Sequence, residues 1–344
     1  MARRPRASPV PPVTWRDGVH LTGTPIWCDA RRRRDVCFVS SADRVVRAGH
    51  GQLIASTTTL ALIGGRDSGH LAVPLRRPFT LGTLRLELIA SGRMLGAAAL
   101  HVDTGMRTVL YAGAIRTHDT SEPAEVRASD AVVVAAPVGE PHHQFAPRAE
   151  IAERVIAWSR AHLAAGVSPV LVVETALDGL EVAAYLGAAG LPVTGSRSLR
   201  DSASTLGHGA ARGSVGPLGS TAAFVTGLGS SAAAAPANDV APLRAPGKEP
   251  AVLVRAESDR GRLAGTAQAP SALVSARALD PQAGWDATFA WPFVAGRDQL
   301  LGWIEHTRAK HVFITGACAD SVAAALGARA HVLGPPQQMA LFSS

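Results

Sequence analysis

The stretch V-C-F-V-S-S-A-D-R-V-V-R-A-G-H-G, from Val36 to Gly51, is an apolar run that passes into a polar loop at Ser40. The run predicts a core β-strand, and the polar residues predict the loop that follows it. Before it, a hairpin is expected over Trp15 to Leu21, because Asp17-Gly18 favours a tight turn between strands. The amino-terminal part of the chain is therefore expected to form a sheet.

The sequence after this stretch contains two successive patterns. Short strands are expected over residues 84–89, 99–102 and 109–113, with Asp103-Thr104-Gly105 as a hairpin turn. From Asp130 onward, buried strands alternate with helices, a pattern typical of parallel strands joined by helical crossovers. Together the two patterns predict an α/β fold in which two layers of strands are covered by helices.

The segment from Gly195 to Lys248 consists mainly of Ala, Gly, Ser and Pro. Such a composition buries little apolar surface, so partial disorder is expected there. The resulting division has three parts: residues 1–190 as the first half of a sandwich, 191–250 as a reduced insertion and 251–344 as the second half.

Composition limits the class of protein. The chain has 344 residues and a hydrophobic content of 47%, which is ample for a core. Three cysteines without a C-x-x-C spacing support neither a disulfide framework nor a cysteine zinc site. The basic, Pro-rich start lacks the apolar run of a signal peptide, and no long apolar segment indicates a membrane span. A cytoplasmic location with no membrane contact is therefore expected.

Positive charge is carried almost entirely by arginine. The balance of 34 Lys+Arg against 27 Asp+Glu gives a net charge of +7. The planar guanidinium suits phosphate, so a nucleic-acid surface is one explanation, and the codon bias of a GC-rich genome is another. The densest cluster, Arg31 to Arg34, is expected in a solvated turn.

Further segments extend the pattern begun by Phe38-Val39-Ser40. They are S-G-R-M-L-G-A-A-A at 91–99, Y-A-G-A-I-R at 111–116, S-A-R-A-L-D-P at 275–281 and the ending Q-M-A-L-F. In this order they resemble motifs of the metallo-β-lactamase-fold nucleases. The similarity is to the bacterial exonucleases associated with ATP-dependent DNA ligases, and to the β-CASP type of RNA-processing factor. The resemblance implies a metallo-β-lactamase-like αββα sandwich with a reduced, partly disordered β-CASP-like insertion.

The resemblance also shows which residues replace the family's metal ligands. Members of that family hold two zinc ions with histidines and aspartates. The corresponding positions in this chain are Ser41, Asp43, Val45, Val46, Arg93, Ala114, Val294 and Gly316. A catalytic zinc site needs three protein ligands, and Asp43 alone among these residues could serve as one. The site is therefore expected to lack catalytic residues, metal and cofactor.

Three functions follow as hypotheses. The first is a catalytically inactive nuclease homologue that binds single-stranded DNA or RNA, or acts as a scaffold, in bacterial DNA repair or RNA processing. The second is an active metal-dependent hydrolase with displaced ligands, for which the pair His142-His143 is the best candidate. The third is a structural subunit of a complex with an ATP-dependent DNA ligase or a helicase.

Arginines beside the former ligand positions bear on the first hypothesis. The candidates for phosphate binding are Arg44, Arg47, Arg93 and Arg116. Guanidinium groups could take the place of the metal ions and contact phosphates directly. The alternative is that these arginines fill the pocket and pair with acids such as Asp43.

Overall fold

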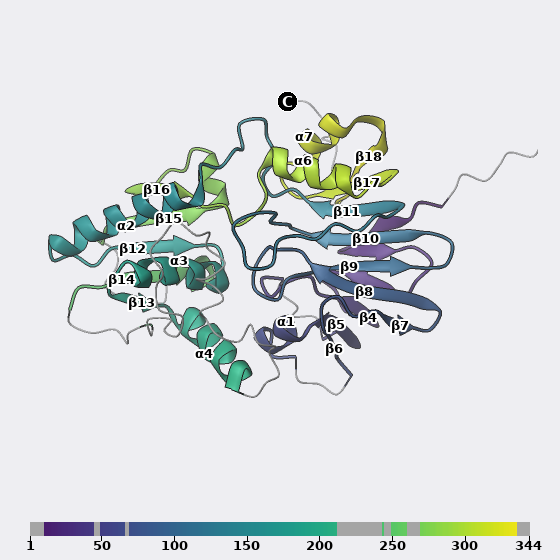
Figure 1. Cartoon of the computed structure of the whole chain (residues 1–344), viewed down its shortest axis with the longest axis horizontal. Coiled ribbons are helices and arrows are strands. Elements are labelled where there is room, and N and C mark those ends of the chain that lie inside the picture. The colour runs from purple at the N-terminus through teal and green to yellow at the C-terminus, as the bar shows by residue number, and fades with distance from the viewer. Residues whose placement is uncertain are drawn as a thin grey trace, which may run out of the picture.

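The computed structural model describes residues 10–44, 49–65, 69–211, 243, 249–259 and 269–335. Within these ranges the chain forms three sheets with helices on their faces (Figure 1). The α/β class expected from the sequence is confirmed. None of the helices in these ranges is long and apolar enough to span a bilayer.

The first sheet has six strands in sequence order and uses the amino-terminal quarter of the chain. Its strands are β1 Val13–Trp15, β2 Val19–Leu21, β3 Ile26–Cys28, β4 Val36–Phe38, β5 Gln52–Ser56 and β6 Leu71–Val73. The hairpin β1–β2 turns at Asp17, whose φ of 56° lies in the left-handed region that Asp tolerates better than most residues. From β3 onward the pairing is parallel.

The second sheet has seven strands in the order β18-β17-β11-β10-β9-β8-β7. These are β7 Phe79–Leu81, β8 Leu84–Ala90, β9 Ala98–Asp103, β10 Thr108–Gly113, β11 Ala131–Ala135, β17 His311–Thr315 and β18 Ala330–Val332. The β9–β10 hairpin has the Asp103-Thr104-Gly105 turn expected from the sequence. The parallel pairing of β11 with β17 joins segments far apart in the chain.

The two sheets pack face to face and carry helices on their outer faces. One core lies between them and includes Phe38 of β4 and Leu100 of β9. Helix α1, Thr57–Leu62, covers the outer face of the first sheet through Leu60. Helices α6, Arg297–His306, and α7, Ala319–Leu326, cover the outer face of the second sheet. The alternation of side chains in each strand puts one set in the shared core and the other under a helix.

The third sheet forms a separate layered unit, seen on the left of Figure 1. Its five parallel strands have the order β13-β14-β12-β15-β16. They are β12 Val170–Val173, β13 Val193–Gly195, β14 Val252–Ala256, β15 Ser271–Ser275 and β16 Ala287–Ala290. Helices α2 Arg148–Ala164, α3 Ala176–Ala188 and α4 Arg197–Ala211 share one apolar core with it. The described residues also form short 3₁₀ turns, η1 Glu257–Asp259, η2 Ala276–Leu279 and η3 Gly327–Arg329.

This unit corrects the expected division of the chain. Helix α2 and strand β12 were placed in residues 1–190, and β14 and β15 in residues 251–344, yet all belong to the same sheet. The inserted unit therefore starts near Arg148 and continues to about Ala290, well beyond 191–250. Most of the low-complexity segment lies outside the described residues. The boundary was misplaced because periodicity identifies a strand without identifying its partner.

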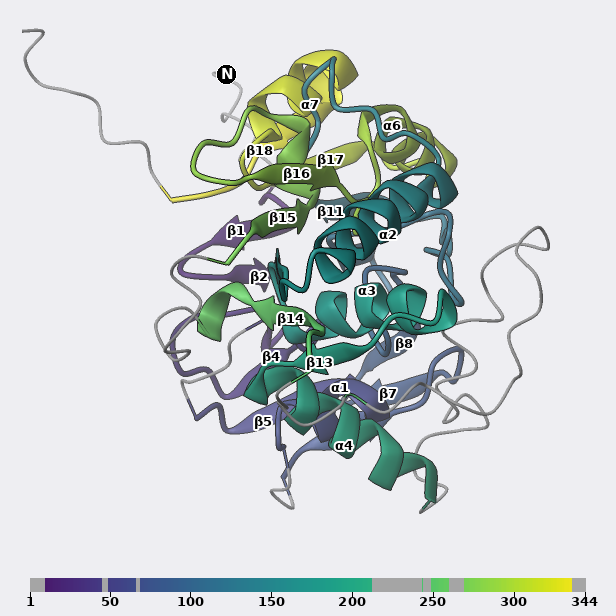
Figure 2. The same ribbon diagram turned by 90° about the vertical axis from the view of Figure 1, so that its left-hand side faces the viewer.

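Two of the contacts between the inserted unit and the sandwich position the candidate site. Helix α4 packs against α1, as both views show (Figures 1 and 2). The second contact is made by α3 against loops that leave the two large sheets, including the loop of Arg93. That second contact contains Asp43 and Arg93, two of the positions where the sequence resemblance expects metal ligands.

Candidate functional site

The loop after β4 is fixed by a buried carboxylate. Asp29 accepts hydrogen bonds from the backbone N–H of Ser40 at 2.9 Å and from its hydroxyl at 2.6 Å. The Tyr111 hydroxyl donates to the same carboxylate at 2.8 Å, and burial together with Asp29 raises the pKa of Tyr111. Sequence reasoning missed Asp29, which holds the polar loop in place at the end of β4.

Asp43 lies in this loop and contacts both Ser41 and Arg93. Its carboxylate accepts a short hydrogen bond from the Ser41 hydroxyl and is 3.6 Å from the Arg93 guanidinium. Burial on its own would raise the pKa of Asp43, but Arg93 and Arg44 hold it below its usual value. Asp43 is therefore an ionised partner of Arg93.

Arg93 is almost completely buried and forms a bidentate ion pair with the inserted unit. Its two terminal nitrogens donate to Asp178 of α3 at 2.6 and 3.0 Å. The side chains of Arg93 and Asp178 are 5% and 2% exposed, so water screens this pair little. Because fork-to-fork geometry fixes direction as well as distance, the pair sets the position of α3 against the sandwich.

A second bidentate pair lies beside the first. Arg116 donates to the two carboxylate oxygens of Glu181 at 2.8 and 2.9 Å, and Arg148 approaches the same group at 3.3 Å. The indole N–H of Trp291 donates to Glu181 at 2.9 Å. Burial acts to raise the pKa of Glu181, but Arg116, Arg148 and Trp291 together lower it to about 2. Glu181 is thus the most heavily bonded carboxylate in the contact between the two units.

Gly92 brings the two arginines together. It has a φ of +74°, and a Cβ atom there would lie 2.0 Å from the carbonyl oxygen of Arg116. The N–H of Arg116 donates to the carbonyl of Ser91 at 3.0 Å, which closes the contact between the two loops. Only glycine permits this approach, so the S-G-R sequence is required by the geometry of the site.

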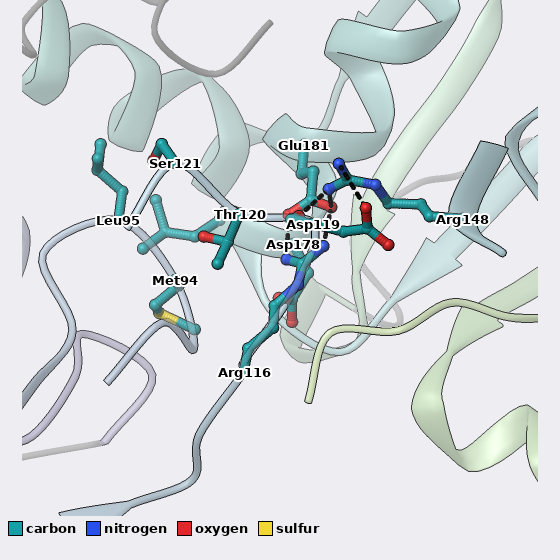
Figure 3. Close-up of a pocket in the computed structure, with 10 residues that line it drawn as sticks. Met94, Leu95, Arg116, Asp119, Thr120, Ser121, Arg148, Asp178 and Glu181 are labelled. Carbon is teal, nitrogen blue, oxygen red and sulfur yellow. Dashed lines mark hydrogen bonds and ion pairs between the residues drawn. The ribbon is translucent and has the colours of Figure 1, made fainter. Parts of the chain in front are cut away.

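The two ion pairs leave little empty space. The remaining cavity, lined by Met94, Thr120 and Ser121 as well as the charged groups, has a volume of about 20 Å³. Figure 3 shows Arg116 and Arg148 converging on Glu181 from different segments of the chain. A cavity of this size holds about one water molecule. It has no room for a nucleotide.

Comparisons with known proteins add a likeness of fold. No family model matches the chain, and no curated protein matches it. A solved structure of a protein of unknown function from Enterococcus faecalis V583 is similar over 88% of this chain and 79% of its own, with a TM-score of 0.50. The two sequences are 12% identical, so the likeness concerns fold alone.

Several expected ligand positions lie together but lack polar atoms. Ala114 and Val294 share a small apolar cluster with Val138 and Ala276. Gly316 has a φ of +104°, and a Cβ there would lie 2.7 Å from the carbonyl oxygen of Ala136. Val45, Val46 and Arg47 lie outside the described residues. Ala114 and Val294 thus lie in apolar packing, and Gly316 lies against the backbone of Ala136, in place of metal ligands.

The three arginines considered for phosphate binding that lie in the described ranges have carboxylate partners. Arg93 and Arg116 are paired as described, and Arg44 lies 3.7 Å from Asp29. The geometry therefore favours the alternative in which these arginines fill the site and neutralise acids. Sequence reasoning did not identify their partners Asp178 and Glu181. The sequence did contain a signal for these two acids. Asp178 and Glu181 are three residues apart in the apolar helix A-L-D-G-L-E-V-A-A, so both lie on the same helix face.

The histidine pair forms the one group within the described ranges with ligand atoms close enough for a metal. His142, His143 and Asp280 have ligand atoms within 4.8 Å of one another. However, Nδ1 of His143 accepts hydrogen bonds from the N–H groups of Gly139 and Glu140 at 2.9 and 3.1 Å.

Those two bonds place the ring proton of His143 on Nε2, which donates to Asp280 at 2.9 Å. A metal on Nε2 would require a proton on Nδ1, facing two N–H donors. The hydrogen bonds of His143 therefore favour a structural role, in which it connects the loop at Gly139 and Glu140 to Asp280, over a role as a metal ligand.

Proposed function

We propose that this chain is a non-catalytic protein of the metallo-β-lactamase fold, similar to the ligase-associated and β-CASP nucleases, that serves as a scaffolding component in DNA repair or RNA processing. The layered sheets with an inserted parallel unit support this relationship. So does the order of the motifs along the chain.

The observation that carries the proposal is the bidentate pair of Arg93 with Asp178. Arg93 stands where the resemblance expects a zinc-binding histidine. Its guanidinium projects into the contact with α3, and Asp43, the remaining acid of the motif, is occupied as a counter-ion. A hydrolytic mechanism uses metal ions to ionise water and to clamp the scissile phosphate. Arg93 cannot ionise water, because a guanidinium does not bind metal and remains protonated. Its terminal nitrogens are already bound to Asp178 and are not available to clamp a phosphate.

The same contact supports a rigid structural part. Two buried bidentate pairs and the packing of α4 on α1 hold the inserted unit against the sandwich. A nuclease of this architecture needs an open cleft between the units for its substrate. Here the side chains that line that boundary contact one another. Rigid alignment of two units is the property expected of a scaffold.

The experiment measures metal content and cleavage together. Purified full-length protein is analysed by plasma mass spectrometry, then incubated with labelled single-stranded DNA and RNA in the presence of added zinc or manganese. Far less than one transition metal per chain and no cleavage are expected. The variant His142→Ala/His143→Ala should behave like the parent, as should His118→Ala, which changes an exposed histidine elsewhere.

A stoichiometric metal and a nuclease activity that are both lost in His142→Ala/His143→Ala, and retained in His118→Ala, would establish the hydrolase with displaced ligands instead. Purification with an ATP-dependent ligase or a helicase, without any nucleic-acid contact, would favour the structural-subunit hypothesis.

A further inference from the structure

A second group of arginines lies on the surface, in the loops that follow β1 and β3. Arg31, Arg32 and Arg33 are exposed in the loop between β3 and β4, and Arg16 is exposed in the β1–β2 turn. We call these four residues the arginine turn. The acids on the same two loops are Asp17, Asp29 and Asp35. Asp17 pairs with Arg32 at 3.0 Å, and Asp29 is hydrogen-bonded to Ser40 and Tyr111. Arg16, Arg31 and Arg33 have no carboxylate partner among the described residues.

Backbone bonds hold the arginine turn in one conformation. The N–H of Arg31 donates to the carbonyl of Asp17 at 2.8 Å, and that of Arg34 donates to His50 at 3.1 Å. The guanidinium of Arg34 stacks 3.7 Å above Trp27 and donates to the carbonyl of Arg16 at 2.6 Å. A fixed backbone lowers the entropic cost of binding a ligand on these side chains.

A hollow of about 780 Å³ lies beside the turn. Its walls include Trp15, Asp17 and Arg31 from the turn, and Asp320 of α7 with Val332 and Leu333 at the end of β18. Val332 is 46% exposed although it belongs to a strand. A side chain of a partner could therefore bury apolar surface here, next to free guanidinium groups.

The apolar wall includes an edge strand. β18 is the last strand of its sheet within the described residues. The N–H of Leu333 donates to Ile314 of β17 at 2.7 Å. Because N–H groups alternate in direction along a strand, the N–H of Val332 points away from β17, toward the open edge. Open edges pair with extended peptide segments.

These features favour a peptide over a nucleic acid. An edge strand offers hydrogen bonds that match a peptide backbone. A base would need a free aromatic face, and the ring of Trp27 is already stacked with Arg34 and with His20, whose ring lies 4.6 Å away. The other aromatic residue here, Trp15, is partly buried against the core between the sheets.

We propose that the edge of β18, the hollow beside Trp15 and the arginine turn together bind an extended acidic segment of a partner protein, with apolar side chains in the hollow and carboxylates on Arg16, Arg31 and Arg33. In an extended segment, alternate side chains point in opposite directions, so one face meets the hollow and the other the guanidinium groups. The inference rests on the proposed scaffolding function and gives the chemistry of the partner.

The test uses fluorescence anisotropy with the full-length protein. The probe is a labelled peptide of about eight residues, long enough to span ~25 Å, that alternates glutamate with leucine or phenylalanine. A matched peptide with lysine in place of glutamate and an oligothymidylate of similar length are the comparison probes. The acidic probe should bind at least about tenfold more tightly than either, and more weakly as salt is raised.

Variants separate charge from strand pairing. Arg31→Glu/Arg33→Glu should weaken binding of the acidic probe about tenfold or more. The charge-matched control Arg77→Glu/Arg85→Glu, at the opposite edge of the seven-stranded sheet, should change it less than about twofold. Val332→Pro removes the outward N–H and should abolish most of the binding, whereas Val332→Thr keeps that donor and should retain it. Circular dichroism verifies that each variant is folded.

Equal binding of the acidic and basic peptides would overturn the inference. Tighter binding of oligothymidylate, or an Arg31→Glu/Arg33→Glu variant that binds the acidic probe like the parent, would also overturn it. The metal-content and cleavage measurements do not depend on peptide binding, so they test the proposed non-catalytic function independently of this inference.

Discussion

Arginine plays opposite parts in two regions of this molecule. In the contact between α3 and the sandwich, Arg93 and Arg116 are 5% and 3% exposed and bound to carboxylates in bidentate geometry. In the arginine turn, Arg32 is 76% exposed, and Arg16, Arg31 and Arg33 have no acid partner within the described chain. The same side chain thus fixes two units together in one place and remains available to a ligand in the other. Burial, more than residue type, decides which part it plays.

The largest effect is expected from Glu181→Gln. The substitution removes a buried charge and leaves Arg116 without its counter-ion, while Arg148 keeps only Asp119, 3.8 Å away. Breaking one partner of a buried pair typically costs about 3–5 kcal/mol of unfolding free energy. Urea denaturation followed by circular dichroism measures this loss. The double variant Arg116→Met/Glu181→Leu should lose less than Glu181→Gln alone. An equal or greater loss in the double variant would mean that the lost unfolding free energy comes from removing the Arg116–Glu181 ion pair and not from leaving a buried charge unpaired.

Gly92→Ala should come next. The new Cβ would lie 2.0 Å from the carbonyl of Arg116 at a φ of +74°, so the loops of Arg93 and Arg116 would have to separate. Backbone strain of this kind costs about 1–3 kcal/mol. The control is Gly82→Ala, since Gly82 has a φ of +59° but no atom within 4 Å of its added Cβ. A thermal melt that shows the same shift for both variants would argue against close contact at Gly92.

The pH dependence of stability tests the charge state of the α3 contact. The folded pKa of Glu181 is about 2, against an ordinary value of 4.5. A depressed pKa contributes stability that is present above 4.5 and is lost as the pH falls toward 2. The difference corresponds to roughly 3 kcal/mol at most.

Denaturation midpoints measured from pH 6 down to the acid limit should therefore fall more steeply for the parent than for Arg116→Met/Glu181→Leu. Identical slopes would show that Glu181 does not contribute to acid sensitivity. Asp43, whose pKa is also lowered, titrates in both proteins and provides the common background.

The smallest effect on stability is expected in the arginine turn. Arg31→Glu/Arg33→Glu changes exposed, unpaired side chains, so the unfolding free energy should shift by less than about 0.5 kcal/mol. Differential scanning calorimetry of this variant beside Glu181→Gln compares the two regions directly. A large loss in the arginine turn would indicate that its side chains support the fold, which the structure gives no reason to expect.

Local sequence signals predicted individual elements well. The strands expected over residues 84–89, 99–102 and 109–113 are β8, β9 and β10, with limits that agree to within one residue at each end. The hairpin turns at Asp17-Gly18 and Asp103-Thr104-Gly105 also lie where the sequence indicates. These features depend on φ preferences, periodicity and caps, which act over a few residues.

Residue type alone determined that, among the positions which the resemblance assigns to metal ligands, Asp43 is the one side chain suited to bind a metal. Only the tertiary structure decided what replaced the metal ligands. Arg93 meets Asp178 across 85 positions, and Arg116 meets Glu181 across 65. Strand β12 likewise pairs with β14 and β15, which follow a long intervening segment. Such contacts depend on how whole elements pack, and packing energies are summed over many distant residues, so no local pattern in the sequence encodes them.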